Sequence, residues 1–164
     1  MSACHNLLIA VDDSEATARA LTYVASIVDG HRDVRLHLLH ITPIPPGFLE
    51  FGGRENPQVE EHREAELAQS RLGYLEDLAQ AVFAQAQAIL DHAGVPAEAV
   101  DTHFLTTIDR EDLIQNLLEV ARTNACDTIV VGRQSHSWLR ELVQHHLADE
   151  LVRKGEGFTL WVVE

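Results

Sequence analysis

The stretch TIVVG, residues 128–132, decides the fold class of this 164-residue chain. It is an apolar run of β-branched residues that closes on one glycine, which is typical of a strand covered on both faces. The runs NLLIAV (6–11) and FTLWVV (158–163) are nearly as continuous. Because strands buried on both faces occur in parallel sheets flanked by helices, these three runs predict an α/β protein.

Two further strand-like runs and four helical patterns complete the order of elements. The run VRLHLLHI (34–41) alternates more because His37 and His40 interrupt it, and VDTHFL (100–105) follows later. Helical patterns separate the five runs, at residues 12–30, 57–94, 109–124 and 137–155. Strict alternation predicts a single doubly wound domain over residues 1–164: a parallel sheet with helices on both faces, joined by right-handed crossovers.

Apolar spacing predicts which side of each helix packs on the sheet. The first helix has a cap at Asp13 or Ser14 and a terminator at Gly30. Its predicted face consists of Ala16, Ala20, Val24 and Ile27. In the long second helix the predicted face is Leu67, Leu75, Leu78, Val82, Ala86 and Ile89.

Composition excludes several classes of function. With 12 Lys and Arg against 26 Asp and Glu, the formal charge is −14 and no basic block is present. General affinity for nucleic acid or an anionic membrane is therefore not expected. No apolar run approaches the ~20 residues that span a bilayer. Cys4 and Cys126 form no CxxC motif, so a reduced cytoplasmic protein is expected.

Residues 43–57, PIPPGFLEFGGRENP, are predicted to form an irregular loop because prolines and glycines cluster there. Phe48, Leu49 and Phe51 make this loop unusually apolar. Two interpretations stay open. The loop is either a flap packed on its own domain or a lid that binds a protein partner.

In an open parallel sheet, ligands bind beyond the carboxyl ends of the strands. The groups expected there are VDDS (11–14) and VGRQS (131–135). The carboxylate of Asp12 has two possible roles. It can accept a hydrogen bond from an adenine amino group or a ribose hydroxyl, or it can cap the helix that follows.

Over essentially its full length the chain resembles the universal stress protein family. The order and spacing of four segments carry the resemblance: residues 6–21, 36–43, 117–133 and 148–163. The resemblance implies a Rossmann-like, five-stranded parallel sheet of order 3-2-1-4-5, with the site between strands one and four. It also implies a homodimer paired through the final strand, at Leu160, Trp161, Val162 and Val163. The alternative for Trp161 is that its ring faces a helix of its own subunit.

Many members of the family bind ATP through Gly-x₂-Gly-x₉-Gly-Ser/Thr after the fourth strand. In this chain the motif maps onto Gly132, Ser135, His145 and His146, so one of its four residues is retained. A residue with a side chain in place of a left-handed glycine costs about 1–2 kcal/mol. We expect instead a helix that starts near Ser137 or Trp138 and crosses the phosphate region. The chain therefore resembles the branch of the family that does not bind ATP.

A case for a smaller ligand remains. By the resemblance, Asp12, Ile41 and Gly132 match positions that line the adenosine half of the pocket. Arg133, His145 and His146 are possible donors to an anion. ATP or AMP is thus a possible ligand, although no cofactor is expected.

Metal and enzyme hypotheses find less support. His145 with Asp149 and His146 with Glu150 are spaced i,i+4, but no second pair has ligand spacing, so no metal is expected. No GxSxG elbow is evident and neither cysteine sits at a helix start beside a histidine, so no catalytic residue is predicted. The expected function is a regulatory or protective stress-response binding protein. The alternative is an adenine-nucleotide switch that uses the crevice between strands one and four.

Overall fold

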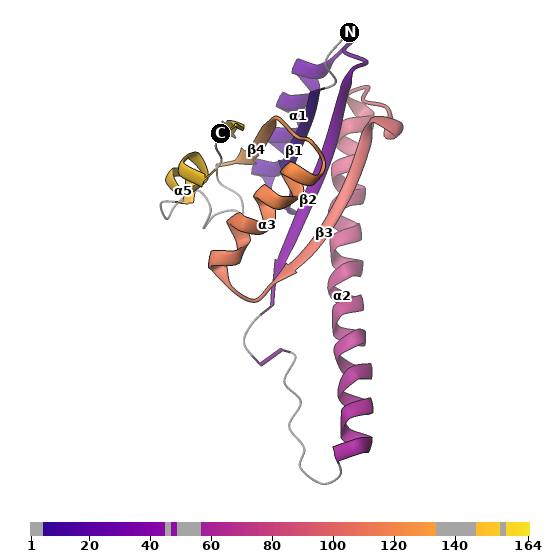
Figure 1. Ribbon diagram of the computed structural model, residues 1–164. Coiled ribbons are helices and arrows are strands. Elements are labelled where there is room, and N and C mark those ends of the chain that lie inside the picture. Colours follow the sequence, from indigo (N-terminus) through magenta and orange to yellow (C-terminus); the bar gives the residue numbers. More distant parts are fainter. Residues whose placement is uncertain (1–4, 45–46, 49–56, 134–146, 155–156) are drawn as a thin grey trace.

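The computed structural model describes residues 5–44, 47–48, 57–133, 147–154 and 157–164 (Figure 1). Its five strands form one sheet in the order β3-β2-β1-β4-β5, and the neighbouring strands run parallel. The strands are β1 (His5–Ala10), β2 (Val34–Pro43), β3 (Val100–Thr107), β4 (Thr128–Gly132) and β5 (Thr159–Val163). The predicted α/β class and the strand order 3-2-1-4-5 are confirmed.

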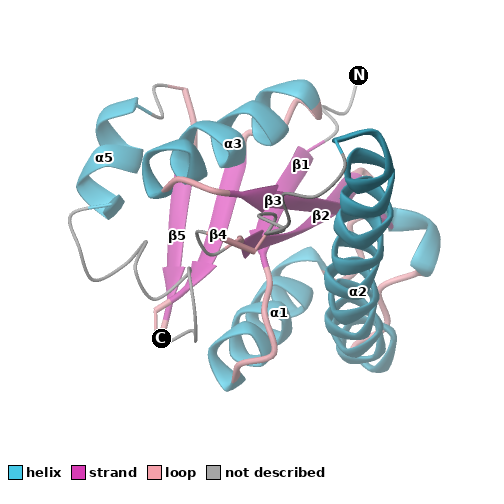
Figure 2. Ribbon diagram, turned by 90° about the horizontal axis from the view of Figure 1, so that it is seen from below, coloured by secondary structure: helices cyan, strands magenta, loops and turns pink. Residues whose placement is uncertain are grey.

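Helices cover both faces of this sheet. They are α1 (Glu15–Val28), α2 (Pro57–His92), α3 (Arg110–Thr123) and α5 (Leu147–Lys154), with a short 3-10 helix at Ala97–Ala99. Figure 2 shows α1 and α2 on one side of the strands and α3 and α5 on the other. The predicted start of the last helix, near Ser137 or Trp138, lies outside the described residues.

The core consists of two layers, one on each face of the sheet. Alternate residues of β1 belong to different layers: Leu8 and Ala10 pack with α3, whereas Leu7 and Ile9 pack with α1 and α2. Both faces of a central strand are therefore dry, and this is the physical reason that its sequence is continuously apolar.

Helix α1 begins as predicted. Ser14 is its N-cap, and the Ser14 Oγ atom accepts a hydrogen bond from the backbone N–H of Thr17 at 3.2 Å. The chain turns away after the helix at Gly30, whose φ of +76° favours a residue without a Cβ atom. Most of the predicted face is buried, although Ile27 is 39% exposed.

The predicted face of α2 was wrong in part. Leu67 and Leu78 are 41% and 47% exposed. The residues of α2 that are buried in the core are Ala79, Phe83, Ala86 and Leu90. The amino-terminal part of this helix runs past the edge of the sheet (Figure 1). Apolar side chains there have no strand to pack on, so apolar spacing alone does not identify the buried face.

Most of the predicted loop at residues 43–57 lies outside the described residues. Ile44 is buried, and its N–H donates to the carbonyl of Thr107 at 2.7 Å. The guanidinium of Arg71 on α2 donates to the carbonyl of Phe48 and lies 5.3 Å from the centre of its ring. These contacts hold the described part of the segment on its own domain. Within the described ranges, no helix combines the length and apolar character needed to cross a bilayer.

Candidate functional site

The carboxyl edge of the sheet brings together three of the predicted site residues. Ala10 of β1 pairs with Leu39 of β2, so two residues further along each chain Asp12 and Ile41 lie at the same level. Ile9 pairs with Val130 of β4, which places Gly132 level with the residue that precedes Asp12. The structure therefore gathers Asp12, Ile41 and Gly132 at the ends of neighbouring strands.

Asp12 organises the turn between β1 and α1. Its Oδ1 atom accepts hydrogen bonds from the backbone N–H of Ser14 at 2.9 Å, from the Thr17 hydroxyl at 2.6 Å and from the Ser14 hydroxyl. The backbone N–H of Asp12 donates to the Thr17 hydroxyl oxygen at 3.1 Å. Ser14 is the residue that caps α1, so Asp12 supports the cap rather than forming it.

The second carboxylate oxygen of Asp12 has no partner among the described residues. Asp12 is 6% exposed, and its Oδ2 atom is buried without a hydrogen bond to any described residue. A buried carboxylate oxygen without a donor carries a desolvation cost of about 1–3 kcal/mol or more. A donor supplied from outside the chain would remove that cost. This oxygen is therefore the feature of the edge that most directly fits a ligand.

Gly132 is required by packing. A Cβ atom at Gly132 would lie 2.9 Å from both the carbonyl carbon and the carbonyl oxygen of Ala16, inside van der Waals contact. Gly132 ends β4 directly beneath the first turn of α1. The close approach of β4 to α1 accounts for this glycine without any phosphate.

Ile41 and its neighbour His40 occupy opposite sides of the sheet. Ile41 has no exposed surface and belongs to the core layer of α3. His40 was not predicted as a site residue. Its Nδ1 atom lies 2.8 Å from the carbonyl oxygen of Val11, and its ring stacks on Phe104 with 6.4 Å between ring centres. The interruption of the apolar run at His40 was the available signal in the sequence.

Of the remaining predicted site residues, Arg133 lies within the described structure. The Arg133 guanidinium forms an ion pair with the side chain of Glu164, and its backbone N–H donates to the carbonyl of Val163 at 2.8 Å. Both partners lie at the end of β5. The predicted positions Ser135, His145 and His146 lie outside the described residues.

The final strand is the outermost strand of the sheet beside β4. Trp161 packs in the core layer of α1 and α2, and its ring meets Tyr23 of α1 edge to face at 6.3 Å. Val162 points to the other face and is 43% exposed. The Trp161 ring thus contacts a helix of its own chain.

A second polar cluster, on β2 and β3, was missed from the sequence. His37 Nδ1 lies 3.0 Å from His103 Nε2, and Arg35 Nε donates to Asp101 Oδ2 at 2.6 Å. Burial lowers the pKa of both histidines, and the hydrogen bond from Arg35 lowers the pKa of Asp101. His37 Nε2 is buried without a partner among the described residues. Nowhere in the described ranges do three His, Cys, Asp or Glu side chains gather in a way that would hold a metal ion.

Comparison with known proteins identifies the family. The sequence profile described as the universal stress protein family matches residues 4–157. The chain belongs to this family. The match covers strands β1 to β4, and β5 follows the matched region. No curated protein sequence matches the chain significantly.

Solved structures, among them those of universal stress proteins, share the fold. The structure of hypothetical protein MJ0577 superposes with a TM-score of 0.65 at 17% identity, covering 99% of this chain and 96% of that one. A universal stress protein from Archaeoglobus fulgidus in complex with dAMP has a TM-score of 0.55 at 17% identity and covers 98% of both chains. A universal stress protein in complex with cAMP has a TM-score of 0.57 at 14% identity and covers 99% of both. At these identities the comparison establishes the Rossmann-like α/β fold.

Proposed function

We propose that this chain is a cytoplasmic stress-response protein that acts by binding, in a regulatory or protective role, and catalyses no reaction. In this proposal it lacks the loop that cradles a triphosphate in other members of its family. The observation that most supports the absence of this loop is the position of Gly132. It is the one glycine retained from the four-residue motif, and its contact with Ala16 explains it through packing alone.

The sequence after Gly132 supports the same proposal. Phosphate-binding loops expose backbone N–H groups, and glycines let the chain adopt the required conformations. Between Gly132 and Gly155 this chain has no glycine, and histidines stand at positions 145 and 146. Arg133, which directly follows Gly132, is paired with Glu164.

A second candidate function is an adenine-nucleotide switch in the crevice between β1 and β4. The observation that favours it is the buried Oδ2 atom of Asp12, which accepts no hydrogen bond from the described residues and is of the type that accepts one from an adenine amino group or a ribose hydroxyl. Two relatives of the same fold were solved with dAMP and cAMP. Neither ligand carries a triphosphate, so a monophosphate is the form that suits a chain without the glycine loop.

One experiment separates the two candidates. Freshly purified protein is denatured, any released nucleotide is identified, and the native protein is titrated calorimetrically with ATP and with AMP. The first proposal expects neither co-purified nucleotide nor heat. Micromolar binding of ATP would refute it, whereas binding of AMP with little or no binding of ATP would favour the nucleotide switch.

A matched pair of variants assigns any binding to the crevice. Asp12→Asn replaces the unpartnered carboxylate oxygen with an amide group. Asp13→Asn removes one charge from the adjacent exposed position and serves as the control. If AMP binds in the crevice, the Asp12 variant loses affinity at least about tenfold, as expected for a buried acceptor, and the Asp13 variant retains it.

Two contacts with partners belong to the same proposal. The chain forms a homodimer through the outer edge of β5, where an unpaired strand needs cover. The apolar segment at residues 43–57 contacts a protein partner, and its deletion would abolish that contact while leaving the sheet intact.

A further inference from the structure

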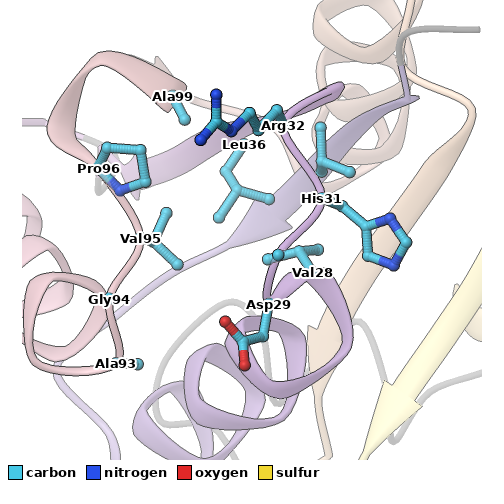
Figure 3. A pocket seen from close by; sticks show the side chains of 12 residues that line it. Val28, Asp29, His31, Arg32, Leu36, Ala93, Gly94, Val95, Pro96 and Ala99 are labelled. Atoms are coloured by element: carbon cyan, nitrogen blue, oxygen red, sulfur yellow. The ribbon is translucent and has the colours of Figure 1, made fainter. Parts of the chain in front are cut away.

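A cavity of about 360 Å³ lies at the opposite end of the strands from Asp12. It is enclosed by two segments, residues 28–36 between α1 and β2 and residues 93–99 between α2 and β3 (Figure 3). Both segments belong to the described part of the chain. The volume falls within the range of about 300–1,000 Å³ that is typical of small-molecule sites.

The floor of this cavity is apolar. Leu36 and Val95 form its floor and are 1% and 8% exposed. Val28, Val34 and Ala99 are partly buried and pack against the same core layer. An apolar group of a ligand that enters here displaces water from the partly buried walls formed by Val28, Val34 and Ala99.

The mouth carries one charge of each sign. Arg32 and Asp29 lie on opposite sides of the Leu36 and Val95 side chains, whereas the ring of His31 points away from them (Figure 3). Neither the Arg32 nor the Asp29 side chain forms a hydrogen bond or ion pair with another residue in the described part of the chain. The two groups are therefore available to a ligand.

The backbone gives the two sides of the mouth different potentials. Helices α1 and α2 both end at this cavity, at Val28 and His92. The carboxyl end of a helix carries a partial negative charge, so two such ends beside Asp29 favour a cation. On the other side of the mouth, the guanidinium of Arg32 suits the carboxylate of a ligand, because arginine pairs with carboxylates in a planar, bidentate geometry.

Two turn glycines leave the entrance open. Gly30 and Gly94 have φ values of +76° and +88°, and nothing lies within 4 Å of the position that a Cβ atom would take. Each turn therefore borders open space rather than packed side chains.

We propose that this cavity binds a small zwitterion, a 2-amino acid with an apolar side chain. The carboxylate pairs with Arg32, the ammonium group lies near Asp29 and the two helix ends, and the side chain packs on Leu36 and Val95. This site is separate from the carboxyl edge of the sheet and does not depend on the function proposed for that edge.

Three probes of matched shape test the ligand class. The protein is titrated with L-phenylalanine, with 3-phenylpropionate, which lacks the ammonium group, and with phenethylamine, which lacks the carboxylate. L-Leucine is included as a second amino acid. We expect saturable binding of at least one amino acid with Kd at or below about 1 mM, a weak affinity in absolute terms. The two truncated probes bind at least tenfold more weakly, and the NMR amide signals of Gly30 and Gly94 shift.

Variants of exposed residues assign the binding to this cavity without disturbing the core. Arg32→Gln weakens amino acid binding at least tenfold, whereas Arg153→Gln, at an exposed position on α5, changes it less than twofold. Three results would overturn the proposal: no saturable binding of either amino acid, equal binding of all three phenyl probes, or unchanged binding by the Arg32 variant. AMP added to the same samples shifts signals near Asp12 if it binds, so the two sites are distinguished in one experiment.

Discussion

The Nδ1 atom of His37 on β2 lies 3.0 Å from the Nε2 atom of His103 on β3. At this distance one nitrogen donates and the other accepts, so the facing pair holds a single proton. A second proton would bring two N–H groups face to face. Asp101, whose Oδ2 lies 3.8 Å from His37 Nδ1, and Arg35 are the charged groups beside the pair.

This pair makes stability depend on pH. Burial lowers the pKa of His37 and of His103 below the ordinary value of 6.5, so below that pH the unfolded chain binds more protons than the folded one. The contribution of this pair to the free energy of unfolding is expected to be constant above neutrality and to fall as the pH drops from about 6.5 towards the lowered pKa. Urea denaturation at a series of pH values from 8 to 5 measures it.

Variants identify the groups responsible for that pH dependence. His103→Gln removes one titrating ring and should make the loss of stability below pH 6.5 shallower. His62→Gln is the control, because the His62 side chain is 83% exposed on α2. An equal slope in the wild type and the His103 variant would contradict the assignment.

Gly132→Ala should destabilise the protein by about 1–3 kcal/mol, since overpacking forces the backbone to move. The added Cβ would lie 2.9 Å from backbone atoms of Ala16. Gly73→Ala is the matched control, because Gly73 lies within α2 with nothing near its Cβ position. Removing a helical glycine there should stabilise by about 0.5–1 kcal/mol. Thermal and urea unfolding measure both changes, and a loss of similar size in the two variants would exclude the packing explanation.

Thr17→Val tests the hydrogen bonds that hold Asp12. The hydroxyl of Thr17 both donates to Asp12 Oδ1 and accepts from the Asp12 backbone N–H, and Thr17 is buried. Its loss leaves a buried N–H without a partner, which should cost about 1–3 kcal/mol. Thr22→Val serves as the control, because the exposed Thr22 hydroxyl donates only to the carbonyl of Ala18 within the same helix. Chemical denaturation of both variants decides whether the turn depends on this hydroxyl.

Cys126 should be chemically inert in the folded protein. It is 6% exposed, and burial raises the pKa of its thiol from 9.0 to about 11, with Asp127 adding to the shift. The thiolate is the reactive form, so its fraction at pH 8 falls about 100-fold. A Cys4→Ser protein, which retains Cys126 alone, should react with a disulfide reagent only after unfolding. Rapid reaction of the native protein would show that the thiol is accessible.

Val162→Lys should convert the proposed homodimer into a monomer. Val162 is 43% exposed on the outermost strand, and a lysine there would lose hydration when a second β5 strand approached. Val152→Lys, at a position on α5 that is 69% exposed, is the control. Light scattering measures the mass of each variant. A wild-type monomer, or a Val162 variant that stays dimeric, would exclude this interface. Trp161 is a poorer test because it packs on Tyr23 of its own chain.

Local sequence predicted the elements better than their contacts. The run TIVVG became the buried strand β4, and Ser14 became the cap of α1. The predicted face of α2 was wrong in part: Ala86 is buried, whereas Leu67 and Leu78 are exposed, and the amino-terminal part of the helix passes beyond the sheet (Figure 1). Spacing reports which residues share a side of a helix, and it does not report where the supporting sheet ends.

The candidate site, too, was predictable from the sequence only in part. Asp12, Ile41 and Gly132 lie at the ends of neighbouring strands because parallel strands end at one edge of the sheet, and their role in binding stays a prediction. The free oxygen of Asp12 and the contact of Gly132 with Ala16 were not predictable, since both depend on how α1 descends onto β4.

By itself, the sequence determined the alternation of strands and helices, the double burial of the central strands and hence a parallel sheet, because these follow from local hydrophobic patterns and chain handedness. Tertiary structure alone decided which groups meet across long stretches of chain. Pairing of β2 with β3 brings His37 to His103, 66 residues apart. The two segments that lead from helices α1 and α2 into the sheet enclose the cavity beside Arg32. Such contacts depend on register and on the path of each helix, which no local pattern encodes.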